Sequence, residues 1–247
     1  MDPQEYELMF RVELTHWWYR GMTTITRTIL QRCVLTGGAV KVLDAGCGTG
    51  GAMTTNLAGL GRVTGVDISA SALNFCQSRG LAALTQASVD RLPFAGASFN
   101  LVTSFDVIYE RSVKNDLNAV KEFARLLVPG GFLLLRLPAY DWLRGHHDKV
   151  VHTARRYTTG RVAELLREAG LSVRVLSYAN TFLFPLALVK RLSDRLKPAC
   201  PEQSDLTLPL GPFNTIFTAI LSREAPLVAG SCLPYGLSVF ALAQKPQ

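Results

Sequence analysis

Glycines at alternate positions form the first group of residues whose types and spacing could do chemistry. Gly46, Gly48 and Gly50 follow a short apolar run over residues 40–44. Glycine can turn tightly and lets its own backbone approach a ligand closely. Further along, Asp67 ends a second apolar run, where a carboxylate can accept two hydrogen bonds from a ribose diol. The arrangement predicts a site for a ribose-containing ligand; the alternative is an ordinary glycine turn followed by a solvated acid.

A second group lies in residues 138–157, which hold three of the four histidines. His147 beside Asp148 could act as a base with an orienting carboxylate, and His152 could instead complete a metal pair with it. Arg155 and Arg156 are suited to gripping a carboxylate or phosphate through two hydrogen bonds each. The alternative is a solvated basic loop. No third ligand is fixed for a metal, so the sequence predicts none.

Short strands that alternate with helices must position both groups. The apolar patterns predict strands over 40–44, 63–67, 81–86, 99–104, 132–137, 171–178 and 237–243. Helical spacing and capping residues predict helices over 5–33 with a break, 52–60, 70–79, 118–128, 159–169, 187–197 and 213–224. Such alternation indicates an α/β fold with a largely parallel sheet, whose ligands bind at the carboxyl ends of the strands.

The glycine segment resembles a known family. Val42-Leu-Asp-Ala-Gly-Cys-Gly-Thr-Gly50 is similar to the signature loop of class I S-adenosylmethionine-dependent methyltransferases, and Gly65-Val-Asp-Ile-Ser69 is similar to their second motif. With the Leu-Val-Pro-Gly-Gly turn at 127–131, the resemblance covers residues 41–137. It implies a Rossmann-like sheet of seven strands, mostly parallel with the last strand antiparallel.

The resemblance also implies S-adenosylmethionine as cofactor and S-adenosylhomocysteine as product. The glycine loop would pass under the methionine moiety, Asp44 would orient the loop, Asp67 would hold the ribose, and Asp90 would bind the adenine amine. The expected cofactor residues are Asp44, Gly46, Cys47, Gly48, Gly50, Asp67, Ile68, Asp90, Arg91, Leu92 and Phe105.

Glu110 follows the fourth predicted strand, where family members approach the methyl group and many carry a histidine. A carboxylate could serve as a base there only if burial raises its pKa. His16-Trp-Trp-Tyr-Arg-Gly21 and the pattern His147-Asp148 with Arg155-Arg156-Tyr157 resemble a bacterial subgroup often linked to cell-envelope sugars or lipids, or to secondary metabolism. The second histidine of that pattern falls at Thr153 here, which makes His152 a weaker candidate than His147.

The catalytic candidates are therefore His147, Asp148, His152 and Glu110. The candidates for contacting an acceptor are Trp18, Tyr19, Tyr109, Tyr140, Arg155, Arg156, Tyr157, Asn180, Asn214 and Glu224.

We expect one methyltransferase domain over residues 1–247. Its parts are an N-terminal helical lid (1–35), a Rossmann-like core (36–179), a helical insertion between strands six and seven (180–235) and the last strand (236–247). The insertion could be a cap over the acceptor, a dimerisation hairpin, or a basic amphipathic surface that meets anionic lipid. The cap is favoured, because residue 180 leaves strand six at the ligand-binding edge.

Composition narrows the classes of protein to which the chain can belong. The chain has 247 residues, a formal net charge of +7 and five scattered cysteines without a Cys-x-x-Cys pair. This composition favours a globular protein of the cytoplasm and gives no support for a disulfide framework or a zinc site. Residues 1–11 do not read as a secretory signal, and glycines and prolines break the apolar window 225–243, for which we expect loop plus strand rather than a membrane span.

The sequence thus predicts methyl transfer to a small-molecule acceptor, anionic if the arginines bind it, with O-methylation and His147 as general base. A nucleic-acid methyltransferase is disfavoured, because the Asn/Asp-Pro-Pro-Tyr type of tetrapeptide is lacking after strand four. The other alternative is a cofactor-binding module without turnover. Peripheral membrane contact, and a monomer or a homodimer, stay open.

Overall fold

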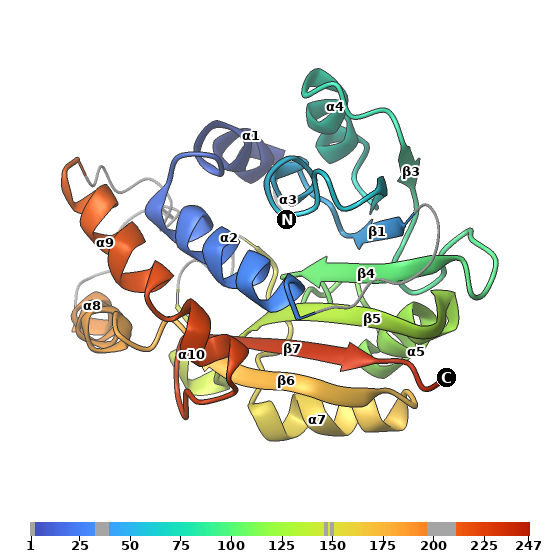
Figure 1. The fold of residues 1–247 in the computed structure, drawn as a ribbon. Helices are drawn as coiled ribbons and strands as arrows, with labels where there is room; N and C mark the ends of the chain where they lie inside the picture. Colours follow the sequence, from blue (N-terminus) through green and yellow to red (C-terminus); the bar gives the residue numbers. More distant parts are fainter. Residues whose placement is uncertain (1–2, 33–39, 146–147, 149–150, 197–210) are drawn as a thin grey trace.

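The sheet is the centre of the molecule. The computed structural model describes residues 3–32, 40–145, 148, 151–196 and 211–247. Within this part, seven strands form one sheet in the order β3-β2-β1-β4-β5-β7-β6 (Figure 1). Neighbouring strands are parallel except that β7 runs antiparallel to β5 and β6. The fold predicted from the sequence is confirmed. The strands are β1 (Lys41–Ala45), β2 (Arg62–Asp67), β3 (Leu84–Gln86), β4 (Phe99–Phe105), β5 (Leu127–Pro138), β6 (Ser172–Ala179) and β7 (Ser238–Gln244).

Helices cover both faces of this sheet. The helices are α1 (Pro3–Val12), α2 (Trp17–Leu30), α3 (Gly51–Thr55), α4 (Ala70–Ser78), α5 (Asp116–Leu126), α7 (Thr159–Glu168), α8 (Phe184–Leu196), α9 (Phe213–Ser222) and α10 (Ala225–Ala229), with a 3-10 turn, η1 (Asp141–Leu143). Side chains of a strand alternate between its two faces. Leu43 therefore packs in the cluster that α5 and α7 cover, whereas Val42 packs in the cluster beneath α2 and α10.

The N-terminal helices differ in role. Helix α2 is part of the core, because Met22, Ile25 and Ile29 have no exposed surface and pack on the sheet. Helix α1 instead lies beside α4, over the loop that follows β1 (Figure 1). Only α1 therefore covers the glycine loop.

The segment between β6 and β7 packs on the core mainly through its last two helices. Helix α9 packs along α2, and α10 packs on α2 and β6. For residues 225–243 we expected loop plus strand, which is wrong at the start, because residues 225–229 form α10. Pro226 stands in the first turn of this helix, where proline is tolerated because the first amides of a helix have no intrahelical partner.

Other boundaries differ from prediction as well. Residues 127–128, expected at the end of a helix, begin β5, and the helix expected from residue 187 begins at Phe184. The helix expected over 52–60 ends at Thr55, and the chain then turns through Gly59 and Gly61, whose φ angles are +85° and +151°. The third strand starts at Leu84 rather than at residue 81. Among the described residues, no helix is both long and apolar enough to cross a lipid bilayer.

Candidate active site

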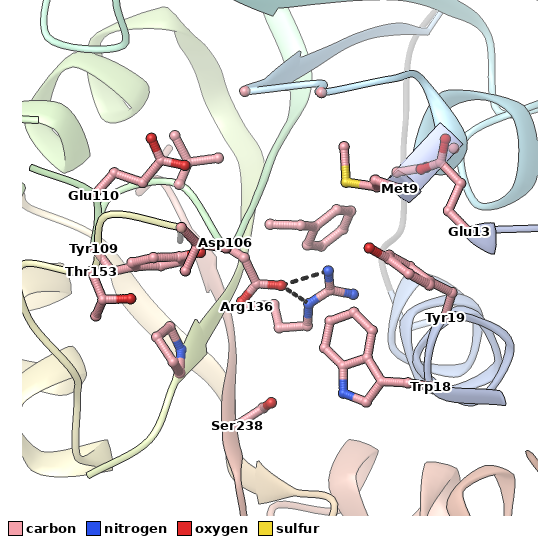
Figure 2. Close-up of a pocket in the computed structure, with 18 of the residues that line it drawn as sticks. Met9, Glu13, Trp18, Tyr19, Asp106, Tyr109, Glu110, Arg136, Thr153 and Ser238 are labelled. Carbon is pink, nitrogen blue, oxygen red and sulfur yellow. Dashed lines mark hydrogen bonds and ion pairs between the residues drawn. The ribbon is translucent and has the colours of Figure 1, made fainter. Parts of the chain in front are cut away.

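A cavity of about 700 Å³ lies at the carboxyl ends of β1, β4 and β5 (Figure 2). Open α/β sheets bind their ligands at this edge. One end, here called the glycine-loop end, is lined by Asp44, Gly46 to Gly48, Asp67, Ile68 and residues 87–89. The other, the α8 end, is lined by Trp18, Arg136, Asp148, Arg156, Leu186, Ala187, Lys190 and Arg191.

The glycine loop owes its shape to backbone that other residues rarely adopt. Gly46 and Gly48 have φ angles of +86° and +53°, a region that glycine enters at little cost. A Cβ atom at Gly46 would lie only 2.2 Å from Cγ2 of Val107. The loop therefore runs against the chain after β4, with no room for a side chain between them.

Asp67 fixes the glycine loop and retains lone pairs that can accept hydrogen bonds from a ligand. Its Oδ2 accepts a hydrogen bond from the amide of Gly48, and its Oδ1 accepts one from the amide of Ser69, both at 2.9 Å. Each carboxylate oxygen has two lone pairs, so one on each oxygen remains for a ribose hydroxyl. Burial raises the pKa of Asp67, and the two amide hydrogen bonds oppose that rise.

Asp44 is buried at the floor of the cavity. Its Oδ1 accepts a hydrogen bond from the hydroxyl of Thr103 at 2.8 Å, whereas Oδ2 has no partner among the described residues. Burial raises the pKa of this carboxyl to about 7. An orphaned buried acceptor costs free energy, so a ligand that brings a donor or a positive charge to this place would be favoured.

Four expected cofactor residues lie elsewhere. The described cavity wall includes Cys47, Ile68 and Phe105 but not Gly50, Asp90, Arg91 or Leu92. Asp90 lies behind the turn formed by residues 87–89, and its Oδ2 is 3.5 Å from the amide of Lys114. That turn, rather than Asp90, borders the cavity.

Helix α1 closes the glycine-loop end with residues that no sequence pattern revealed. Tyr6, Met9 and Glu13 line the cavity. The Glu13 carboxylate accepts hydrogen bonds from the Thr49 hydroxyl and, at 2.6 Å, from Arg79. The Arg79 guanidinium stands 4.3 Å from the ring centre of Phe10 on α1. The ion pair therefore fastens the end of α1 to the end of α4, and the Thr49 hydroxyl links Glu13 to the glycine loop.

The α8 end of the cavity holds an ion pair that the sequence analysis also missed. Arg136 donates to Asp106 Oδ2 from Nε at 2.7 Å, and Figure 2 shows the pair facing Trp18 and Tyr19. Its guanidinium carbon lies 4.7 Å from the Trp18 ring centre and 5.1 Å from that of Phe105. A signal was present, because Arg136 is the one charged residue in the apolar run 132–137.

The 144–157 segment is fastened by its own charged residues. Asp148 accepts from Arg156 Nε at 2.8 Å and from Nη2 at 3.0 Å, and both side chains line the cavity. Burial alone would raise the pKa of Asp148, but the Arg156 guanidinium holds it below its usual value. Arg155 turns away and donates to the carbonyls of Ile108 and Val113.

Among the remaining candidates here, Tyr157 is buried and its hydroxyl is 3.3 Å from Asp116 Oδ2, so it packs beneath the segment. His147, predicted as the base, lies outside the described residues. His152 has a φ angle of +53° and is not part of the described cavity wall.

Glu110 and Tyr109 line the cavity beside Thr153 (Figure 2). Burial raises the pKa of Glu110 above its ordinary value, and the Ser112 hydroxyl donates to its Oε2 at 3.3 Å. A raised pKa makes a carboxylate a better proton acceptor. Both residues are therefore positioned to contact a ligand.

Three residues of the insertion were predicted to contact an acceptor. One of them lines the cavity, and the other two make hydrogen bonds within the protein. Asn180 lines the cavity, and its Oδ1 has no partner among the described residues. Glu224 is buried and accepts from the amide of Phe182 at 2.7 Å. Asn214 accepts from the amide of Trp17 at 2.7 Å and donates to the Thr15 carbonyl.

Tyr140 stacks on Tyr178 and Trp142 and is not part of the cavity wall described here. The described residues contain no group of three or more side chains arranged to hold a metal ion.

Comparison with known proteins assigns the core. Residues 43–135 match the family model described as a methyltransferase domain. The match covers less than half of the chain, so this segment is similar to a methyltransferase domain. The matched segment contains the glycine loop, Asp44 and Asp67. The residues present fit the ribose hydroxyls and the positive charge of S-adenosylmethionine.

The similarity to two named relatives covers less than half of this chain. A Bos taurus protein named Probable tRNA methyltransferase 9B is 33% identical over 44% of this chain and 23% of its own length. A malonyl-[acyl-carrier protein] O-methyltransferase from Enterobacter lignolyticus is 36% identical over 42% of this chain and 41% of its own. The chain thus spans less than half the length of these curated relatives. A Haloferax volcanii protein solved in complex with the Trm112 methyltransferase activator is 19% identical, with a TM-score of 0.62 over 99% of this chain and 94% of that one, and shares the fold.

Proposed function

We propose that this protein transfers the methyl group of S-adenosylmethionine to a small-molecule acceptor bound at the α8 end of the cavity. The observation that carries the proposal is the continuity of the cavity. It runs from Asp44 and Asp67, which suit the cofactor, to a chamber walled by α2 and α8 and holding two ion pairs. When bound, the cofactor supplies an electrophilic methyl group on a sulfonium.

The protein's part is alignment and proton removal. Holding the acceptor in line with the methyl group removes much of the entropic barrier. If an oxygen is methylated, a base must take its proton. We assign that role to His147, whose neighbour in the sequence, Asp148, lines the cavity. Glu110 is the second candidate, because its carboxyl lines the cavity and burial raises its pKa.

A nucleic-acid acceptor is the second candidate. Its support is the likeness to a protein named as a tRNA methyltransferase. That likeness covers 44% of this chain, and α1, α8 and α9 lie outside the segment matched by the family model. These helices wall the cavity, which favours an acceptor small enough to enter it. The third candidate is a protein that binds the cofactor but does not transfer its methyl group.

The test is transfer of an isotopically labelled methyl group into extract of the host cells, with organic, small-molecule and nucleic-acid fractions counted separately. Label should enter one of the first two fractions, and Asp67→Ala should abolish it by removing the ribose contact. Label confined to RNA or DNA would overturn the small-molecule assignment. No label despite cofactor binding would favour the module without turnover.

The base is tested in the same assay. His147→Ala should lower turnover by about a hundredfold or more while cofactor affinity, measured by calorimetry, stays unchanged. His152→Ala is the matched control and should have a smaller effect. Near wild-type turnover of His147→Ala would exclude it as the base, and a large loss in Glu110→Gln would then move the role to Glu110.

A further inference from the structure

The helices at the α8 end expose large apolar side chains beside the cavity. On α8, Leu186 and Val189 are 54% and 64% exposed, and on α9, Phe213 and Ile216 are 57% and 51% exposed. Within each pair the residues are three positions apart, so each pair shares one face of its helix. These four residues are here called the mouth residues. Helix α9 contains no charged residue, which is unusual for a helix with an exposed face.

The mouth residues are continuous with the cavity. Leu186 lines the cavity and is exposed, so the cavity reaches the surface on α8. On α9, Phe217 lines the cavity, lies 6.0 Å from the ring of the exposed Phe213, and meets Trp17 edge-on at 5.5 Å. Trp17 lines the cavity as well. An apolar path therefore leads from the cavity to the outer faces of α8 and α9.

Charge at this end is positive. Four cationic side chains line the α8 end, namely Arg136, Arg156, Lys190 and Arg191, against two acids, Asp106 and Asp148. Lys190 and Arg191 follow Leu186 and Val189 on α8, at the boundary between the apolar faces and the cavity. The chain as a whole carries a net charge of +7. Apolar residues next to cations match the boundary between the acyl chains and the headgroups of an anionic membrane.

We propose that the acceptor is a membrane lipid with an anionic headgroup, which the protein takes while the mouth residues rest on an anionic membrane. The headgroup enters the α8 end of the cavity, and the apolar chain leaves between α8 and α9. This inference rests on the proposed function for its chemistry. It adds the substrate class and the surface that presents the substrate.

The experiment is co-sedimentation of the protein with vesicles of phosphatidylcholine alone or mixed with phosphatidylglycerol. Wild type should bind the mixed vesicles and bind phosphatidylcholine much less. Val189→Glu combined with Ile216→Glu should lower binding to mixed vesicles at least about tenfold, because two acids replace apolar contacts at an anionic surface.

The matched control is Val173→Glu. Val173 is 40% exposed and lies at the start of β6, at the opposite edge of the sheet. The control should bind vesicles like wild type, and all three proteins should bind S-adenosylmethionine equally by calorimetry, which verifies folding.

The possible outcomes distinguish failure of the lipid acceptor from failure of the proposed methyl transfer. Methyl label in the aqueous fraction without vesicle binding would overturn the lipid acceptor and leave methyl transfer intact. Equal vesicle binding by wild type and the double variant would also overturn the lipid acceptor. So would a wild type that is dimeric and does not bind vesicles, if the double variant is monomeric, because a second copy of the chain would then cover the mouth residues. Label in the organic fraction that falls in the double variant and not in Val173→Glu supports it.

Discussion

The two ends of the cavity are built in opposite ways. The glycine-loop end comes largely from one continuous stretch, residues 44–68, and presents backbone and two carboxylates to the cavity. The α8 end gathers side chains from α2, β4, β5, the 144–157 segment and α8. A site made of consecutive residues leaves a motif in the sequence, whereas a site assembled from distant segments does not.

The two ends also differ in what holds them. Backbone amides fix Asp67 and the glycine loop, so that end depends on chain geometry. The α8 end depends on ion pairs, Arg136 with the partly exposed Asp106 and Arg156 with Asp148, of which the second is buried. A buried pair loses much stability when one partner is removed, because the other charge stays buried without compensation. The α8 end should therefore be the more sensitive to single charge changes.

The largest expected effect is on the Arg156–Asp148 pair. Arg156→Met leaves the Asp148 carboxylate buried without its main partner and should cost about 3–5 kcal/mol of unfolding free energy, measured by urea denaturation. Affinity for S-adenosylmethionine should not change, because that pair lies at the other end of the cavity. A parallel loss of cofactor affinity would mean that the two ends are not independent.

Two further variants sharpen this result. Arg156→Met with Asp148→Asn should recover part of the loss, since no charge is left uncompensated. Arg11→Met is the matched control, because Arg11 forms an exposed pair with Glu7 on α1 and should cost no more than about 0.5 kcal/mol. Equal losses at positions 156 and 11 would contradict the role of burial.

Asp44 gives the glycine-loop end a different signature, a dependence of stability on pH. Its pKa is raised to about 7 in the folded protein by burial, against about 4 in an unfolded chain. The folded state therefore holds the proton more tightly, and the stability it contributes is present below about pH 4 and lost as pH rises to about 7. A shift of this size corresponds to a change on the order of 4 kcal/mol.

Asp44→Asn isolates this contribution. Other carboxylates of the protein respond to pH as well, so the quantity to measure is the difference in unfolding free energy between wild type and Asp44→Asn from pH 4 to pH 8, without cofactor. We expect wild type to lose stability relative to the variant as pH rises. A constant difference would show that the Asp44 carboxyl is ionised throughout this range.

The same contrast explains what the sequence could predict. The alternation of strands and helices predicted the sheet, because local periodicity dictates it. The glycine pattern and the acid after the second strand singled out Gly46 and Asp67, whereas Asp44 was suggested by the family resemblance alone. Arg155 and Tyr157 were predicted to contact the acceptor. Their side chains instead bond to residues 108–116, and polar type alone does not distinguish a ligand contact from a loop fastening. Glu13 and Asp106 gave no local signal, since their partners lie far along the chain.

The smallest expected effect concerns Asn214, which the sequence suggested as a substrate residue. Its side chain joins α9 to the start of α2 by accepting from the amide of Trp17 and donating to the carbonyl of Thr15. Asn214→Ala should therefore cost about 1–2 kcal/mol of stability, as expected for lost hydrogen bonds, while KM for both substrates changes by less than about threefold. Asn214→Asp keeps the acceptor for the Trp17 amide and should lose less. A change in KM for the acceptor at unchanged stability would instead return Asn214 to the α8 end as a binding residue.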